Sequence, residues 1–174
     1  MRSLIEQLRE RCRDLDEEAI ARHLSRLGER YVERFGAEDI ARHLRGLAQL
    51  SPSRPVEVLT SASEDGRIDC TFLAFDYLGE FSLLAGILTG LEFNIQAGDI
   101  FTYARRDPAE EPPTRRETSR WLRRRAYGLS APAVAGQRRR VIDRFQGFIP
   151  SERDFDAWAR ELEGRTREIV ALLE

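Results

Sequence analysis

The sequence predicts an α+β fold in which an N-terminal helical hairpin precedes a four-stranded antiparallel sheet with two helices on one face. Apolar residues recur at helical spacing through residues 3–50, and two prolines within 51–55 then end that pattern. Beyond them, alternating and helical stretches follow one another in the order β-β-α-β-β-α. We therefore expect a helical segment over 1–50 and a sheet domain over 51–174.

The N-terminal segment is predicted to contain one short helix and two longer ones. Ser3 and Glu6 form a capping box, in which each side chain satisfies a free backbone N–H of the first turn. The apolar pattern places the longer helices near 16–35 and 37–49, paired as a hairpin, with Gly36 as the C-cap of the first.

A five-residue motif, Ile-Ala-Arg-His-Leu, occurs at 20–24 and again at 40–44. It puts the only two histidines of the chain, His23 and His43, at equivalent helical positions. Neither has a carboxylate or another histidine at the spacing of metal ligands. We interpret both as packing residues rather than as catalytic or metal-binding groups.

A β-hairpin is predicted next. Residues 56–60 alternate between apolar and polar side chains, Asp65-Gly66 is a turn signal, and residues 68–75 resume the strand pattern. Helical spacing returns over residues 79–91, where Phe81, Leu84, Ala85 and Leu88 share one face.

The same helix carries a second stripe of small residues, Ser82, Gly86 and Gly90. Each glycine weakens a helix by roughly 1 kcal/mol relative to alanine, so this spacing suggests that another backbone approaches closely. We expect a tight helix–helix contact in the core.

Residues 93–103 and 141–149 are predicted strands, and Ser151 is expected to begin a final helix. The stretch between these two strands follows no period and reads as a long insertion, at about 105–139. Residues 67–173 then have the order βαββα, which is a ferredoxin-like unit without its fourth strand. The strand at 56–60 is expected to occupy that vacant edge.

Several short motifs carry a resemblance to a known family. They are Asp-Tyr-Leu-Gly-Glu-Phe-Ser from Asp76 to Ser82, Asn94-Ile95, Ile100-Phe101-Thr102 and Ile142-Asp143-Arg144-Phe145. This set is similar to the ACT domains of the bacterial PII uridylyltransferase family, over roughly 37–104 and 140–173. The chain departs from that pattern at Leu78, where proline is usual, and at Tyr77, where a basic residue is usual.

The resemblance implies a regulatory module that binds a small amino acid such as glutamine, forms a homodimer and controls a fused or partner enzyme in nitrogen or amino-acid metabolism. The ligand-binding residues that it implies are Asp76, Tyr77, Leu78, Gly79, Glu80, Phe81, Ser82, Asn94 and Ile95. It implies no metal and no cofactor. The Gly79 turn has a physical rationale as well, because glycine admits a ligand close to the backbone and helix-start N–H groups favour a carboxylate.

Composition argues against an enzyme. All 28 basic residues are arginine, so lysine chemistry such as Schiff-base formation is absent. No nucleophile, base and acid stand together in a recognisable catalytic pattern. Cys12 and Cys70 are isolated in sequence and are expected to be reduced thiols. No apolar run approaches the roughly 20 residues that span a bilayer, and we expect a cytoplasmic protein with no membrane contact.

The insertion raises an alternative function. Residues 105–140 hold eleven arginines and four acidic residues, a charge of +7, which leaves −9 for the rest of a chain with net charge −2. Such a cluster can bind nucleic acid, and the candidate contacts are Arg120, Arg123, Arg124 and Arg125. We favour instead a solvated loop that pairs with acidic groups, because arginine is the only basic residue type that this chain uses other than histidine.

Overall fold

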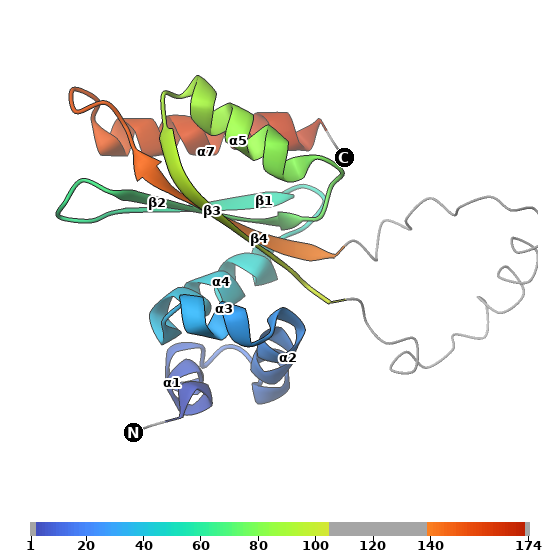
Figure 1. Cartoon of the computed structure of the whole chain (residues 1–174). Helices are drawn as coiled ribbons and strands as arrows, with labels where there is room; N and C mark the ends of the chain where they lie inside the picture. Colours follow the sequence, from blue (N-terminus) through green and yellow to red (C-terminus); the bar gives the residue numbers. More distant parts are fainter. Residues whose placement is uncertain (1–2, 105–138, 173–174) are drawn as a thin grey trace, which may run out of the picture.

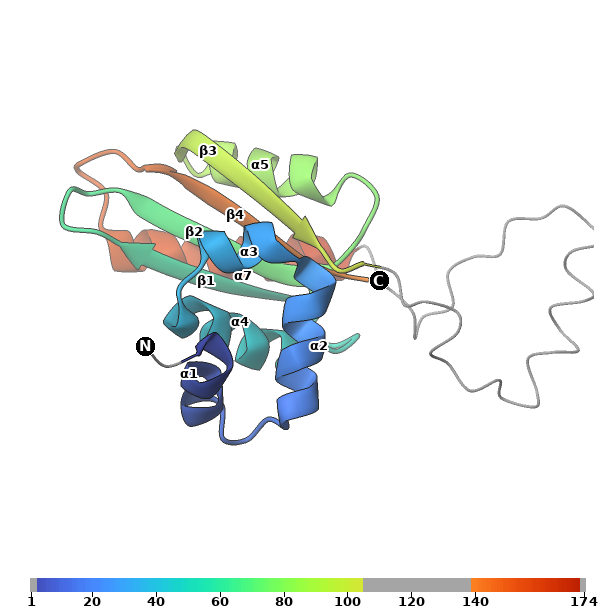
Figure 2. The same cartoon turned by 60° about the horizontal axis from the view of Figure 1, so that its bottom comes forward.

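A computed structural model of the chain describes residues 3–104 and 139–172, and the arginine-rich insertion predicted at about 105–139 falls almost entirely outside them. The described residues form three layers (Figures 1 and 2). Four N-terminal helices cover one face of a four-stranded sheet, and two further helices cover the other. The predicted α+β fold is confirmed.

The lower layer consists of α1 (Leu4–Arg11), α2 (Glu17–Leu27), α3 (Glu29–Arg34) and α4 (Ala37–Gln49). The capping box at Ser3 is present, with the Glu6 N–H donating to the Ser3 Oγ at 3.3 Å. The single helix predicted over 16–35 is wrong, because Gly28 adopts a φ of +78° between α2 and α3. Gly36 is the N-cap of α4 rather than a C-cap.

The sheet contains β1 (Val56–Ala62), β2 (Ile68–Phe75), β3 (Asn94–Thr102) and β4 (Arg140–Phe148). Every neighbouring pair is antiparallel, in the order β1-β2-β4-β3. The predicted hairpin is confirmed, and its register runs from Val56 opposite Ala74 to Ala62 opposite Ile68. As expected, the first strand lies at the edge beside β2.

The upper layer consists of α5 (Glu80–Gly90) and α7 (Phe155–Ala171) (Figure 1). The final helix begins at Phe155 instead of near Ser151. Its N-cap is Asp154, whose carboxylate accepts a hydrogen bond from the Ala157 N–H at 2.8 Å. This bond satisfies one of the backbone donors that a helix start leaves free.

The small-residue stripe of α5 does not make the core contact predicted for it. Ser82, Gly86 and Gly90 are all exposed, and a Cβ added to either glycine would meet nothing within 4 Å. The buried face of α5 instead carries Leu84 and Leu88. The stripe is therefore an outward-facing surface of the upper layer.

Both faces of the sheet are covered by apolar side chains. Successive residues of a strand point to opposite faces, so Phe72 and Leu73 of β2 enter different cores. Leu73 packs with the N-terminal helices and with Ile142, whereas Phe72 packs with α5, α7 and Phe145. The N-terminal helices thus share a hydrophobic core with the sheet.

Candidate functional site

The turn that the sequence singles out lies between β2 and α5. Gly79 is the N-cap of α5 and has a left-handed conformation, with φ +79° and ψ 9°. Glycine adopts this conformation without strain, and it has no side chain to accept hydrogen bonds from the first-turn amides. The preceding residue, Leu78, is fully exposed. The Glu80 N–H donates to the Tyr77 carbonyl at 3.2 Å. The turn therefore leaves the Phe81 and Ser82 amides without a capping side chain among the described residues, and it exposes the apolar side chain of Leu78.

Asp76 is paired within the chain. Its carboxylate lies 2.6 Å from the Arg139 guanidinium, and its N–H donates to the Arg139 carbonyl at 2.8 Å. The resemblance to ACT domains implied that Asp76 binds a ligand. Its pairing with Arg139 ties the turn to the start of β4.

Glu80 points inward. The residue is only 4% exposed, and its Oε2 accepts from the Tyr77 N–H at 3.2 Å. Its Oε1 is buried without a hydrogen-bond partner among the described residues, and the same holds for Oδ1 of Asp143. Burial raises the pKa of Glu80 to about 8, and the Asp143 and Asp76 charges add to this effect. Burial, then Asp76, raise the pKa of Asp143 to about 7.

The other residues near the turn divide between core and surface. Phe81 stacks on Phe145, with ring centroids 4.8 Å apart. Tyr77 is half-buried and packs beside Val56 and Val170. Ser82 is exposed on the first turn of α5.

Asn94 and Ile95 lie at the opposite end of α5. Asn94 begins β3 opposite Phe148, whereas the Gly79 turn lies near the end of β3, where Thr102 is opposite Val141 (Figure 1). The 11 residues of α5 separate the two places, a length of roughly 16 Å at 1.5 Å per residue. One chain therefore brings residues 76–82 together but does not bring Asn94 or Ile95 to them. The nucleic-acid candidates Arg120, Arg123, Arg124 and Arg125 lie outside the described residues.

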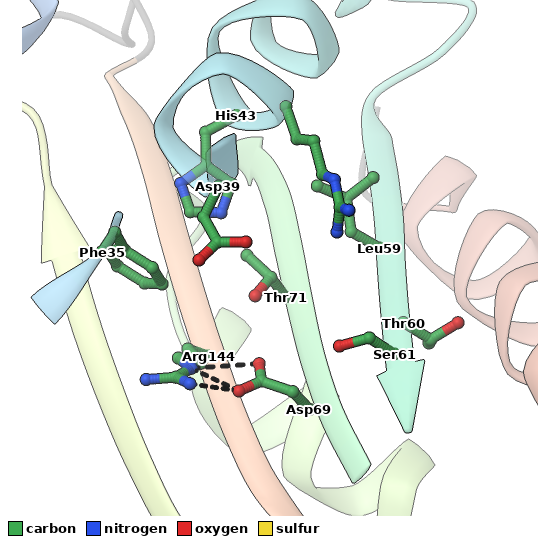
Figure 3. A pocket seen from close by; sticks show the side chains of 10 residues that line it. Phe35, Asp39, His43, Leu59, Thr60, Ser61, Asp69, Thr71 and Arg144 are labelled. Atoms are coloured by element: carbon green, nitrogen blue, oxygen red, sulfur yellow. Dashed lines mark hydrogen bonds and ion pairs between the residues drawn. The ribbon is translucent and has the colours of Figure 1, made fainter. Parts of the chain in front are cut away.

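A cavity that the sequence did not indicate lies between α4 and the lower face of the sheet (Figure 3). Its volume is about 230 Å³. The polar side chains that line it include Asp39, Arg42, His43, Ser61, Thr71 and Arg144. These residues come from one helix and three strands, so only the tertiary fold assembles them.

One end of the cavity is closed by an ion pair. The Arg144 Nε donates to the Asp69 Oδ2 at 2.7 Å, and Gln146 donates to the same oxygen at 3.1 Å. The Arg144 guanidinium also lies over the Phe35 ring, 5.3 Å from its centroid. Asp69 is thus fully engaged, and its partners hold Arg144 in a fixed position.

Above the cavity, two histidines and two tyrosines form a buried chain of hydrogen bonds. The Tyr31 hydroxyl lies 2.8 Å from the His43 Nδ1 and 2.9 Å from the His23 Nε2. The His23 Nδ1 in turn contacts the Tyr103 hydroxyl. Sequence reasoning treated the histidines as packing residues, and both are buried, but it missed the chain because Tyr103 is 80 residues away from His23.

Both imidazoles of this chain are held neutral. Burial lowers the pKa of His23 to about 3, and His43 and Arg140 add to this effect. Burial, then Arg144 and Arg42, lower the pKa of His43 to about 3. A neutral imidazole has one donor and one acceptor nitrogen, so each histidine can join two hydroxyl groups in a line.

In the ranges 3–104 and 139–172, no group of three or more His, Cys, Asp or Glu side chains could hold a metal ion. Cys12 and Cys70 are buried free thiols. No helix in the described part of the chain has the length and apolar character needed to cross a membrane.

The chain matches no protein-family model, no curated protein and no solved structure. Its function therefore has to be inferred from the fold and the sites described above.

Proposed function

We propose that the sheet and its upper helices are a ferredoxin-like domain of the ACT type, and that the chain is a non-catalytic, amino-acid-binding regulatory module. The element order supports this proposal. From β2 to α7 the chain runs β-α-β-β-α, and β1 occupies the edge where a fourth strand would lie. Both crossing helices lie on one face of the sheet (Figure 1).

The observation that carries the proposal is the conformation of the Gly79 turn. A left-handed glycine starts α5. The Glu80 N–H donates to the Tyr77 carbonyl, and the amides of Phe81 and Ser82 have no capping side chain among the described residues. The positive end of the helix dipole adds to their attraction for an anion. This arrangement suits the α-carboxylate of a free amino acid, and the exposed Leu78 offers an apolar contact beside it.

A second copy of the chain would complete the site. β3 is an edge strand, and no other described strand pairs with its outer side. If two β3 strands pair antiparallel, the start of one lies beside the end of the other, which brings Asn94 of one chain towards the Gly79 turn of its partner. Pairing would use residues 97–102, beyond the bulge between Ile95 and Ala97. Binding of the amino acid would then stabilise the homodimer.

Titration calorimetry with the full chain and each of the twenty amino acids tests the proposal. We expect saturable binding of glutamine or another amino acid. Ser82→Asp should abolish the binding at the turn, because it places a negative charge at the helix start where the ligand carboxylate would lie. Ser82→Asn is the matched neutral control and should bind as the unmodified chain does.

A different result would favour the alternative function. If no amino acid binds, and RNA or DNA is retained in a salt-dependent manner that is lost when Arg123, Arg124 and Arg125 are changed to alanine, the chain is a ligand-free interaction module. An amino acid that binds equally well to the unmodified chain and to Ser82→Asp would place its site somewhere other than the turn.

A further inference from the structure

The cavity beneath α4 is separate from the Gly79 turn, because it lies on the lower face of the sheet whereas α5 lies on the upper face (Figures 1 and 3). Its volume is about 230 Å³. A water molecule in the liquid takes up about 30 Å³, so the cavity has room for a ligand of several heavy atoms. It is lined mainly by polar side chains, which would specify such a ligand by hydrogen bonds and charge.

Two hydrogen-bond acceptors in this cavity lack partners among the described residues. Asp39 makes no ion pair or hydrogen bond there, and its carboxylate points towards Thr71 beneath the ring of His43 (Figure 3). Thr71 is 5% exposed, yet its hydroxyl makes no hydrogen bond to any described group. A carboxylate and a hydroxyl so placed match an ammonium group, which has three donors and no acceptor.

Donors line another part of the same cavity. Arg42 uses its Nη2 to bind Glu38 at 2.7 Å, which leaves its remaining N–H groups without partners in the described residues. The hydroxyl of Ser61 is likewise unpartnered there, and it points towards the cavity (Figure 3). These groups match a carboxylate.

We infer that the cavity is a second binding site, for a small zwitterion of the α-amino-acid class. Asp39 and Thr71 accept from its ammonium group, and Arg42 and Ser61 donate to its carboxylate. A simple amine or a simple carboxylate would satisfy only one half of the cavity. This site is distinct from the one proposed at the turn and does not require a second chain.

A ligand bound in the cavity would change the hydrogen bonding of His43. His43 lines the cavity. Its Nε2 has no partner among the described residues, while its Nδ1 bonds Tyr31, which in turn bonds His23. Because each neutral imidazole has one donor and one acceptor, a ligand that bonds the Nε2 also fixes the direction of the hydrogen bonds along this chain. Occupancy should therefore alter the signals of both histidines.

Nuclear magnetic resonance of the ¹⁵N-labelled full chain tests the inference, since the chain has only two histidines. Glycine, the smallest zwitterion of this class, is titrated against the long-range ¹H–¹⁵N signals of the rings, with methylamine and acetate as the half-ligands. We expect glycine to shift the His43 signals saturably, at a midpoint at least tenfold below that of either half-ligand. The absence of a saturable shift, or an equal response to methylamine or acetate, would overturn the inference.

Three variants locate the response. Thr71→Val should raise the glycine midpoint at least tenfold while the chain remains folded by circular dichroism. Thr89→Val makes the same change on the exposed face of α5 and should leave the midpoint unchanged. Ser82→Asp, which disables the turn site, should also leave it unchanged. If Ser82→Asp removes the His43 response, or Thr71→Val does not weaken it, the cavity is not the site, whatever the outcome of the calorimetry.

Discussion

Tyr31 connects the buried polar groups of the lower layer, because its hydroxyl bonds both histidines. Tyr31→Phe removes both bonds and leaves two buried imidazole nitrogens without partners. We expect it to lower the free energy of unfolding by about 2–4 kcal/mol, measured by urea denaturation. Tyr103→Phe removes only the contact at the end of the chain and should cost roughly half as much. If Tyr31→Phe lowers the free energy of unfolding by no more than Tyr103→Phe does, the hydrogen-bond network described here is wrong.

The neutral histidines predict a pH dependence with a definite sign. The pKa of His43 is about 3 in the folded chain against 6.5 in the unfolded one, so between these values the unfolded chain binds more protons. The contribution of the neutral His43 ring to the free energy of unfolding is complete above pH 6.5, and it is lost as the pH falls towards 3. The destabilisation caused by His43→Gln should therefore shrink by about 1.4 kcal/mol per pH unit between pH 6 and pH 5. A constant difference over this range would show that His43 is not held neutral.

The buried carboxyl group of Glu80 predicts the opposite pH dependence of folding stability. Its pKa is raised from 4.5 to about 8 in the folded chain, so its contribution is complete below pH 4.5 and is lost as the pH rises through 8. Glu80→Gln mimics the protonated carboxyl. Relative to the unmodified chain, this variant should gain on the order of 3 kcal/mol of stability between pH 5 and pH 9, measured by urea denaturation. If the free energies of unfolding of the variant and the unmodified chain differ by the same amount at pH 5 and at pH 9, Glu80 is not a buried acid with a raised pKa.

At the scale of secondary structure, two glycines test which helix faces are covered. A Cβ at Gly46 in α4 would overlap the buried Leu73 side chain, whereas a Cβ at Gly86 in α5 would meet nothing within 4 Å. Gly46→Ala should therefore destabilise the chain by about 1–3 kcal/mol in thermal or urea unfolding. Gly86→Ala should stabilise it by about 0.5–1 kcal/mol, because alanine favours helix without a clash. The reverse order would contradict the layer arrangement.

Sequence patterns predicted most elements because each has a local cause. Ser3 and Glu6 cap α1, and the Asp65-Gly66 turn closes the hairpin. The break at Gly28 was missed because the apolar pattern continues across it, and a glycine within a helical pattern does not by itself show a positive φ. The exposure of Gly86 was also missed, since spacing defines a face but does not say what covers it.

At the scale of the whole molecule, the strand order followed from the hairpin and from the order of elements, both of which can be read from the sequence. The packing of the N-terminal helices on the lower face did not follow in the same way. The signal for it was the apolar run Phe72-Leu73-Ala74 in β2, which is typical of a strand buried on both faces. The cavity had no local signal, because Asp39, Thr71 and Arg144 are far apart in the chain and only their packing brings them together.

We propose that amino-acid binding at the Gly79 turn stabilises a homodimer whose site contains Asn94 of the partner chain. Sedimentation equilibrium of the full chain, with and without the amino acid that binds in calorimetry, tests it most directly. We predict that the ligand shifts the apparent mass towards twice the 20.0 kDa of one chain, and that Ser82→Asp abolishes the shift whereas Ser82→Asn preserves it. An apparent mass that does not change with a saturating ligand would contradict ligand-linked dimerisation.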